Sequence, residues 1–404
     1  MKKVAAADIV IFGGGIAGLW LLNRLRASGL SVILFESGAL GGGQTHKSQG
    51  IIHGGMKYAL QGMLTKDAQA VADMPTIWNQ CLQGHGEIDL SGVPVLSEQQ
   101  YLWSPHKFTS KLTGFLAGAA LTSRVKALPK DKYPTVFQHS HFKGDVFSLD
   151  EIVIDVPSLI RELVKANQDA IFKIEPLCDE ELKFDDQGKL VSATVYMSGK
   201  SVEVQAQQFI FTAGAGNEIV IRKLKHPDIA MQRRPLHMVL VKAPFDYSLY
   251  AHCLGFGPRP RITITTHHTQ EGSTIWYLGG QIAEDGVGRD SQTQIKAARE
   301  ELNSLFPWLN FSDAEFVAFM VDRAEPLQKS GLKPESSFTK IVGNMTIAWP
   351  TKLALAPKLA EEIIQQLHAA QLPPQFFDTR ELRSWPMPPL ARPIWEDMFC
   401  KNVA

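Results

Sequence analysis

Residues 8–36 read DIVIFGGGIAGLWLLNRLRASGLSVILFE, and the spacing of their glycines is the strongest structural signal in the chain. An apolar run enters the pattern G-x-G-x-x-G at Gly13, Gly15 and Gly18, and a second apolar run ends on Glu36. In such a strand–turn–helix unit the first glycine permits a tight turn, the second lets the backbone approach a diphosphate, and the third lets the helix pack closely on the strand. The helix N-terminus attracts the diphosphate, and the acid binds ribose hydroxyls. The stretch therefore predicts a dinucleotide-binding site.

The segment after Glu36 indicates which dinucleotide is bound. Residues 37–60 read SGALGGGQTHKSQGIIHGGMKYAL, a long polar loop that contains His46, His53 and a glycine pair. An NAD-binding unit of this kind normally continues directly into its next helix. This loop is instead suited to wrap a diphosphate and a ribityl chain and to pass close to a flat ring. We therefore expect FAD.

Three further segments resemble a known family. They are SQGIIHGGMKYAL from Ser48 to Leu60, QQFIFTAGAGN from Gln207 to Asn217, and AWPTKLALAPKLAEEI from Ala348 onward. Together with the glycine pattern they resemble, in order, the FAD-binding segments of the D-amino-acid-oxidase-like flavoproteins, also called the glutathione-reductase-type FAD group. Within it the chain is most similar to the branch that contains glycerol-3-phosphate dehydrogenase and L-2-hydroxyglutarate oxidase. The resemblance implies a mixed α/β fold, with a glutathione-reductase-type Rossmann FAD-binding domain and an inserted mixed β-sheet substrate domain.

The chain departs from the family pattern in two places. Many members carry a G-x-x-G near the C-terminus, where this chain has WPTK at residues 349–352. The family pattern R-x-G-x-R-P appears only as DRAEP at residues 322–326. The resemblance therefore defines the cofactor better than the substrate.

The glycine pattern predicts FAD contacts at its three glycines and at Glu36, and the resemblance implies further contacts along the same segments. The full set of expected FAD-binding residues is Gly13, Gly15, Ile16, Ala17, Gly18, Glu36, Ser37, Gln44, Thr45, His46, Ser48, Gln49, Gly50, Ile52, Ala213, Gly214, Thr351, Lys352 and Leu353.

Three residues are expected to take part in the chemistry. Hydride transfer to flavin N5 leaves a proton on substrate oxygen or nitrogen, and His53, in the run that resembles the flavin-lining segment, is the expected base. The alternative is that His53 only bonds the flavin or the backbone. Arg323 is the expected carboxylate clamp, because a guanidinium binds a carboxylate through two parallel bonds; the alternative is a salt bridge to Asp322 or Glu325. Lys352 is expected to stabilise the anionic reduced flavin, or else to be an exposed loop lysine.

Composition excludes several other classes of protein. The chain has 404 residues with 41 basic and 41 acidic side chains, so no bulk positive field favours a nucleic-acid partner. No apolar run reaches about 18 residues, so we expect no transmembrane helix. The four cysteines lack C-x-x-C spacing, which argues against zinc and against a disulfide framework. We therefore expect no metal site and a cytoplasmic location.

The strand and helix patterns predict interleaved domains. The expected FAD-binding domain comprises residues 1–80, 147–225 and 321–381, the substrate domain comprises 81–146 and 226–320, and 382–404 form a C-terminal tail. The tail is rich in proline and tryptophan and is expected to be a strap across the protein surface. The alternative is a peripheral contact with a membrane or a partner.

Taken together, these features predict an FAD-dependent oxidoreductase that oxidises a small 2-hydroxy acid or a related polyol phosphate, and we expect the substrate to carry a carboxylate. An amine or amino-acid oxidase or dehydrogenase is the first alternative, because one scaffold serves several chemistries. A non-catalytic flavin- or NAD-binding module is the second. The electron acceptor is left open between oxygen, a quinone and a carrier protein.

Overall fold

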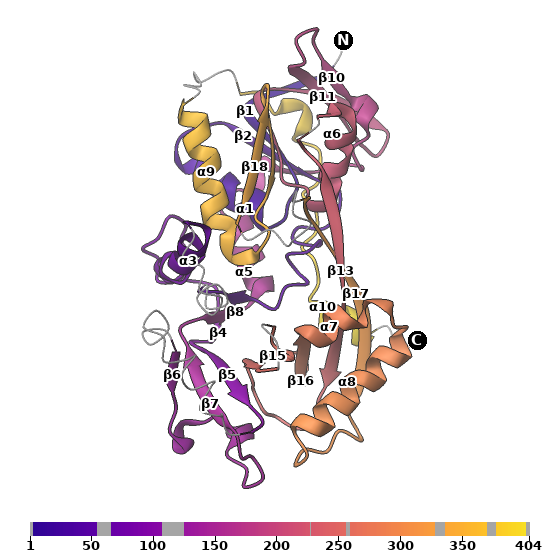
Figure 1. The fold of residues 1–404 in the computed structure, drawn as a ribbon. Helices are drawn as coiled ribbons and strands as arrows, with labels where there is room; N and C mark the ends of the chain where they lie inside the picture. The colour runs from indigo at the N-terminus through magenta and orange to yellow at the C-terminus, as the bar shows by residue number, and fades with distance from the viewer. Residues whose placement is uncertain are drawn as a thin grey trace.

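The computed structural model describes residues 3–54, 66–106, 125–226, 228–255, 259–327, 336–369 and 377–400. The described chain forms two lobes, each built on a large β-sheet (Figure 1). Two long strands, β13 (Met231–Lys242) and β17 (Glu315–Pro326), run between the lobes and pair antiparallel over their full lengths.

The sheet of the first lobe has a parallel centre, which the successive strand–helix units of the sequence require. β12, β1, β2 and β9 run parallel, β19 continues this arrangement beside the end of β12, and the other strands are antiparallel additions. In spatial order the strands are β10 (Leu182–Phe184), β11 (Leu190–Met197), β12 (Lys200–Phe211), β1 (Val4–Phe12), β2 (Val32–Glu36) and β9 (Ile171–Lys173), with β18 (Phe338–Val342) and β19 (Met345–Trp349) at one side.

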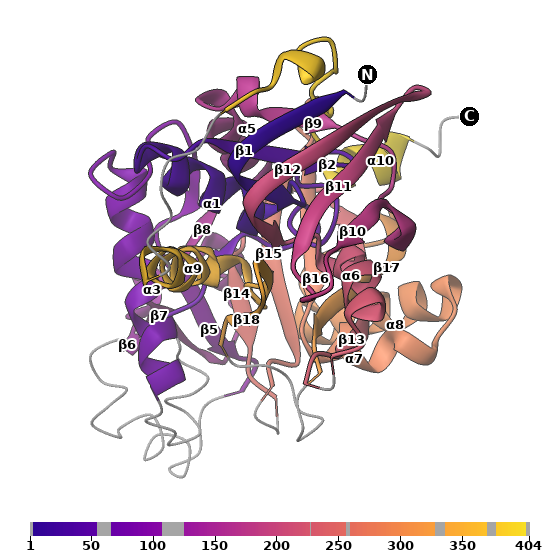
Figure 2. The same cartoon turned by 90° about the horizontal axis from the view of Figure 1, so that it is seen from above.

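Both faces of this sheet are buried, as expected for a parallel sheet. Along β1 the side chains of Ile9 and Ile11 join one apolar cluster, whereas those of Val10 and Phe12 join a second cluster on the opposite face. The first cluster contains side chains of α1 (Ile16–Ala27), α3 (Lys66–Leu82), α5 (Val156–Lys165) and α9 (Ala356–Ala369). The second contains side chains of α6 (Asn217–Leu224). Figure 2 shows α1 and α9 beside the central strands from above.

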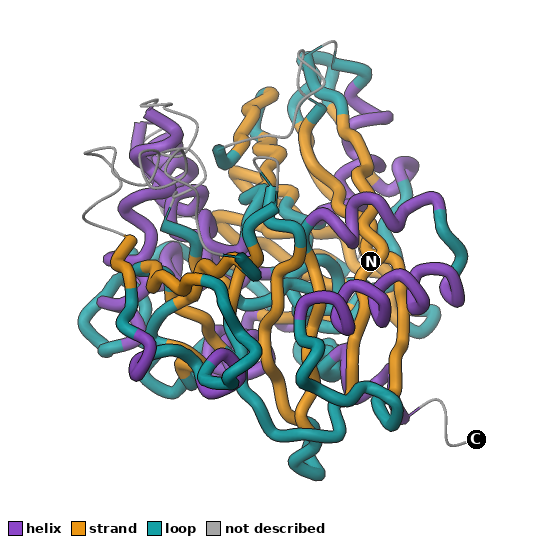
Figure 3. Tube along the Cα trace, turned by 60° about the horizontal axis from the view of Figure 1, so that its bottom comes forward, coloured by secondary structure: helices purple, strands orange, loops and turns teal. Residues whose placement is uncertain are grey.

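The sheet of the second lobe is mostly antiparallel, and Figure 3 shows its strands with helices packed against them. Its spatial order is β17, β13, β16 (Thr274–Gly279), β15 (Ile262–His268), β14 (Ala251–Cys253), β5 (Gln100–Ser104), β7 (Asp145–Leu149) and β6 (Val125–Ala127). The helices α7 (Gln281–Asp285) and α8 (Ser291–Leu305) follow β16. Asp290 caps α8 by accepting a hydrogen bond from the Thr293 N–H at 2.7 Å.

A small third sheet lies between the two lobes (Figure 1). It consists of β3 (Ile51–Ile52), β8 (Ile152–Ile154) and β4 (Val95–Ser97). The antiparallel register pairs Ile52 with Ile152. His53 directly follows Ile52 in the chain, and Glu151 directly precedes Ile152. The two side chains are therefore brought opposite each other.

The C-terminal segment lies across both lobes as a strap. Leu382 and Trp385 are buried in the second apolar cluster of the first lobe. The helix α10 (Ile394–Cys400) then places Ile394 and Trp395 against the second sheet. Both tryptophans of the described tail are thus buried, and neither is presented to a membrane or a partner.

The mixed α/β fold predicted from the sequence is confirmed by this architecture. The predicted domain division stays a prediction, although two strands cross its boundaries: β7 spans the 146/147 boundary and β17 spans the 320/321 boundary. Residues 321–326 pair with β13 and so continue the second sheet.

Candidate active site

A cavity of about 450 Å³ opens beside the carboxyl ends of the parallel strands, where ligands bind in open α/β sheets. We call it the glycine-turn cavity. It is lined by Gly13, Gly15, Ile16, Ala17, Glu36, Gly42, Gly43, Gln44, Thr45, Lys47, Ser48, Gln49, Thr212, Ala213, Gly214, Ala215, Leu236, Met238, Val321, Asp322, Arg323, Ala324, Trp349, Pro350, Thr351, Lys352 and Leu353.

A side chain at any of the three motif glycines would interfere with the turn, with the packing of the helix or with access to the backbone. Gly13 has φ +115°, and a Cβ there would lie 2.6 Å from backbone atoms of Thr212 and Ala213. A Cβ on Gly18 would lie 1.9 Å from the carbonyl oxygen of Gly13, so this glycine allows the close contact between helix and strand. Gly15 has ordinary backbone angles and lines the cavity. It therefore keeps the backbone accessible without being needed for the turn itself.

The N-terminus of α1 presents hydrogen-bond donors at the cavity. The Ile16 N–H donates to Thr45 Oγ1 at 3.0 Å, whereas the N–H groups of Ala17 and Gly18 have no protein acceptor among the described residues. Free N–H groups and the positive end of the helix dipole form a site for an anion such as a diphosphate. This donor set, with no side chain at Gly15, fits a dinucleotide.

Glu36 lies at the same end of the cavity and closes the loop that follows it. Its Oε2 accepts a hydrogen bond from the Gly14 N–H at 2.7 Å, and its Oε1 accepts one from Gly38. Each carboxylate oxygen can accept further bonds. The side chain thus braces the turn and still offers acceptors to the cavity.

The opposite wall is formed by the loop after β12 and the loop before α9. Trp349 Nε1 donates to Gly214 O at 3.0 Å and so holds the two loops together. Thr351 has φ +60°, a strained conformation for a β-branched residue, and its hydroxyl is bonded to Ser336 O at 2.9 Å. Strain of this kind is found where a loop is held in a functional conformation.

Arg323 projects from β17 into this same cavity. Its Nε donates to Arg234 O at 3.0 Å, and within the described residues neither Nη atom has a hydrogen-bond partner. Burial and the neighbouring charge of Arg234 lower the pKa of Arg323 to about 10. Arg234 itself is paired with Glu325. The free guanidinium edge of Arg323 is therefore suited to bind an anion in the cavity.

Six predicted residues do not line the cavity, namely Gly18, Ser37, His46, Gly50, Ile52 and His53. Gly18 acts in packing instead, and the Ser37 carbonyl accepts a bond from Lys173. His46 is buried, its Nε2 has no hydrogen-bond partner among the described residues, and burial lowers its pKa to about 4. A neutral, enclosed imidazole in this position does not contact the cavity.

His53 belongs to a separate group of polar side chains, which we call the His53 cluster: His53, Glu151, His252 and Gln100. His53 Nδ1 lies 3.1 Å from Glu151 Oε2, and the rings of His53 and His252 stack at 6.1 Å. The His53 side chain is 40% exposed, whereas the Glu151 side chain is 5% exposed. The cluster thus has one accessible member held by buried ones.

The same cluster contains ligand types that bind metals. One atom each of His53, Glu151 and His252 lies within 4.8 Å of the others. The sequence gives no reason to expect this grouping, because the three residues are far apart along the chain. Hydrogen bonds already account for the orientation of both imidazoles: His53 is bonded to Glu151, and His252 is bonded to Thr263.

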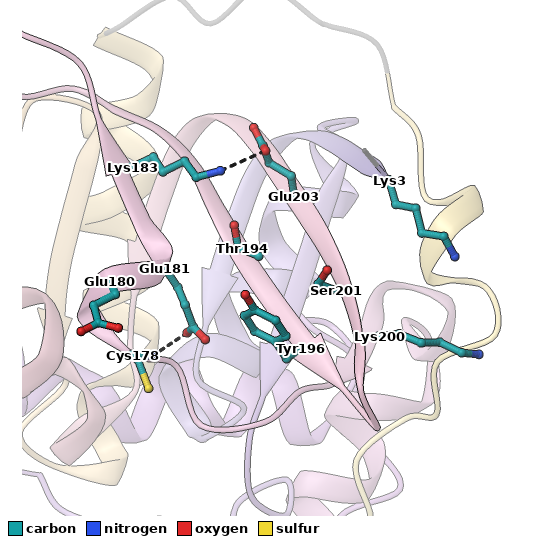
Figure 4. Close-up of a pocket in the computed structure, with 10 residues that line it drawn as sticks. All are labelled: Lys3, Cys178, Glu180, Glu181, Lys183, Thr194, Tyr196, Lys200, Ser201 and Glu203. Carbon is teal, nitrogen blue, oxygen red and sulfur yellow. Dashed lines mark hydrogen bonds and ion pairs between the residues drawn. The ribbon is translucent and has the colours of Figure 1, made fainter. Parts of the chain in front are cut away.

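A larger hollow of about 720 Å³ lies elsewhere, on the β10–β11–β12 side of the first sheet (Figure 4). Its lining carries both charge signs, including Lys183 paired with Glu203 at 3.1 Å. None of the predicted cofactor or catalytic residues lines it. Since it presents neither a glycine turn nor a helix N-terminus, the glycine-turn cavity is the better candidate site.

Several cavity residues were not predicted as contacts. Leu236, Met238 and Val321 come from the second sheet and line the cavity only because β13 and β17 extend to the first lobe. Lys47, in the polar loop after Glu36, also lines the cavity, and its carbonyl accepts a hydrogen bond from the Tyr277 hydroxyl at 2.7 Å. No local pattern in the sequence could have indicated the three positions from the second sheet.

A parallel sheet that ends in a dinucleotide turn, joined to a second sheet beside a histidine–carboxylate pair, is the arrangement of a two-lobed dinucleotide-dependent oxidoreductase. The family model of FAD dependent oxidoreductases (DAO) matches residues 8–349. The chain belongs to this family, and FAD is its cofactor.

Comparison with individual proteins agrees with the family. The chain is 48% identical to the probable FAD-dependent oxidoreductase PA4991 of Pseudomonas aeruginosa, over 99% of this chain and 100% of that protein. The crystal structure of PA4991 superposes with a TM-score of 0.84 over 98% of this chain and 99% of the other, at 43% identity. An FAD-bound L-α-glycerophosphate oxidase from Mycoplasma pneumoniae shares the fold, with a TM-score of 0.63 over 95% of this chain and 99% of the other, at 14% identity.

The α-glycerophosphate oxidase of Streptococcus pyogenes is a more distant relative in sequence. It is 27% identical over 60% of this chain. The aligned part spans 42% of that longer protein. Among the described residues, no helix is both long and apolar enough to cross a membrane.

Proposed function

We propose that this enzyme oxidises a small 2-hydroxy acid or a related polyol phosphate. The observation that carries the proposal is the His53–Glu151 pair, an accessible imidazole held by a buried carboxylate at the junction of the two lobes. The α-glycerophosphate oxidases among the relatives support the substrate class, because their name states the oxidation of a polyol phosphate.

The residues of this chain would supply binding and proton transfer. When bound, FAD would supply the acceptor for the hydride of the substrate C–H bond. The N–H groups of α1 and the acceptors of Glu36 would hold the diphosphate and ribose of the cofactor. His53 would take the proton of the substrate hydroxyl on its free Nε2 while the C–O bond becomes a carbonyl. Two electrons and one proton thus leave as the hydride, and the second proton goes to the imidazole.

Arg323 and Lys352 would supply positive charge in the glycine-turn cavity. Arg323 shares the cavity with the glycine turn, and Gln44 Nε2 donates to Ala324 O at 3.1 Å beside it. This proximity favours the cofactor diphosphate over a substrate carboxylate as its anion. Lys352, in the strained loop after β19, is proposed to stabilise negative charge on the reduced flavin.

Anaerobic reduction of the purified holoenzyme tests the proposal. The flavin absorbance is expected to bleach with a 2-hydroxy acid or with glycerol 3-phosphate and to persist with amino acids and simple amines. Bleaching by amino acids alone would assign the enzyme to amine oxidation instead. If dithionite reduces the flavin but no compound in the panel does, the proposed substrate class is wrong.

A further inference from the structure

Glu151 makes two contacts that together fix the geometry of His53. Its Oε2 lies 3.1 Å from His53 Nδ1, and its Oε1 accepts a hydrogen bond from the Gly54 N–H at 2.9 Å. The carboxylate therefore holds both the imidazole and the backbone immediately after it. Burial alone would raise the pKa of Glu151, but its interactions with the His53 and His252 rings and the hydrogen bond from the Gly54 N–H hold that pKa below its ordinary value.

An ionised Glu151 determines which nitrogen of His53 carries hydrogen. A carboxylate only accepts hydrogen bonds, so Nδ1 must be the donor. Nε2 of the neutral ring then has a free lone pair. This is the tautomer that a base needs, because only an unprotonated nitrogen can take a proton from substrate.

His252 and Gln100 form the buried side of the cluster without competing for this role. His252 Nδ1 lies 2.8 Å from Thr263 Oγ1, and its Nε2 lies 3.4 Å from the amide nitrogen of Gln100. Burial lowers the pKa of His252 to about 4, so its ring is neutral near pH 7. Glu151 is thus left with His53 as its one histidine hydrogen-bond partner among the described residues.

We propose that Glu151 is the positioning residue of the reaction: it holds His53 with Nδ1 protonated and Nε2 free to act as the base. This inference rests on the proposed function for its kinetic consequence. The tautomer of His53 is independent of which substrate is oxidised, so it can be measured separately.

The variant Glu151→Gln separates positioning from a structural role. The new amide oxygen can still accept the Gly54 N–H, whereas the amide nitrogen can only donate and cannot accept from Nδ1. We expect the rate of flavin reduction at saturating substrate to fall about 100-fold, with little change in KM and in FAD content. Glu151→Asp keeps the charge and is expected to recover part of the rate.

Glu396→Gln is the matched control, because Glu396 is also a buried carboxylate that accepts a backbone N–H, that of Gln270 at 2.7 Å. It is expected to leave the rate within about twofold of the wild type. A rate for Glu151→Gln that equals the control would overturn the positioning role.

¹⁵N NMR of the histidine rings in the holoenzyme provides the test that needs no substrate. The His53 resonances are assigned by their loss in His53→Asn. They should show hydrogen on Nδ1 in the wild type and on Nε2 in Glu151→Gln. Hydrogen on Nε2 in the wild type would overturn the inference. So would stoichiometric Zn²⁺ binding that is lost in His252→Asn, because the cluster would then be a metal site. If the tautomer is as expected but no panel substrate bleaches the flavin, the proposed function fails and the positioning of His53 stands.

Discussion

The glycine-turn cavity presents mostly backbone to its ligand at one end, whereas the His53 cluster is made of side chains from four separate segments. Gly13, Gly15 and the first turn of α1 come from a single run of sequence. His53 follows β3, Glu151 precedes β8, and the remaining members lie on β14 and β5. The cavity depends on the absence of side chains at fixed spacing, and the cluster depends on strand register.

This difference separates cofactor binding from substrate chemistry. A diphosphate is recognised by N–H groups and a dipole, which any sequence with the right glycines can supply. A base needs one nitrogen in one protonation state, and that requires a partner whose position is set by tertiary structure. A change in one region should therefore spare the function of the other.

The largest expected effect is the loss of cofactor from Gly15→Val. A Cβ at Gly15 would meet only Thr45 Oγ1, at 3.2 Å, and the backbone there is unstrained, so the fold should persist. The branched side chain would occupy the approach to the backbone. The purified variant is expected to contain less than about a tenth of the wild-type FAD by absorbance, with an unchanged circular dichroism spectrum.

Gly288→Val is the control for this prediction, because a Cβ at Gly288 would meet none of the described residues within 4 Å. It should purify with its full complement of FAD. If Gly15→Val also retains full FAD, the glycine turn is not the diphosphate site, and the contrast between the two regions is lost.

The next effect concerns the cluster and should leave the cofactor in place. Asparagine at position 53 preserves a polar contact with Glu151 but cannot accept a proton at neutral pH. We expect His53→Asn to slow flavin reduction by about 100-fold or more at unchanged FAD content. Stopped-flow measurement with the best panel substrate checks this, and the exposed His85 replaced by asparagine is the control. If His53→Asn reduces the flavin at the wild-type rate, water rather than His53 takes the proton of the substrate.

The sequence predicts the glycine-turn cavity better than the His53 cluster, because the first depends on local spacing and the second on strand register. The turn, α1 and Glu36 are encoded within 29 consecutive residues, and the structure has them as predicted. The loop residues Gln44, Thr45, Ser48 and Gln49 line the cavity, and their contact with FAD stays a prediction.

The rest could not be predicted, because side-chain direction and strand register are tertiary properties. His46 and His53 are seven residues apart in one polar loop, yet one is enclosed and the other is accessible. The pairing of His53 with Glu151 follows from the alignment of Ile52 with Ile152, which no local pattern specifies. Residues of β13 and β17 line the cavity for the same reason.

Acid should destabilise the fold through three buried neutral histidines. Burial lowers the pKa of His46 and of His252 to about 4 and that of His267 to about 3. The unfolded chain binds these protons near pH 6.5 and the native state does not, so stability is lost as the pH falls below 6.5. Each histidine is expected to cost about 2 kcal/mol at pH 5.

His267→Gln tests the size of this effect away from both regions. His267 stacks on Trp395 at 4.2 Å, and its Nδ1 has no hydrogen-bond partner in the part of the chain that the structure describes. On going from pH 7.5 to pH 5, the thermal midpoint of the variant should fall by about 2 °C less than that of the wild type. Equal falls in both proteins would mean that His267 is protonated in the native state.

The smallest effect should distinguish the two anions that Arg323 is able to bind. Arg323→Ala removes a guanidinium from the lining of the glycine-turn cavity, and we expect FAD affinity to weaken about tenfold, or about 1.4 kcal/mol, with KM almost unchanged. Arg233→Ala is the control, because Arg233 lies on β13 beside it but forms exposed ion pairs with Asp322 and Glu218. Isothermal titration of the FAD-free proteins measures the affinity. A raised KM with wild-type FAD affinity would instead assign Arg323 to the substrate carboxylate, and the cavity would then serve both cofactor and substrate.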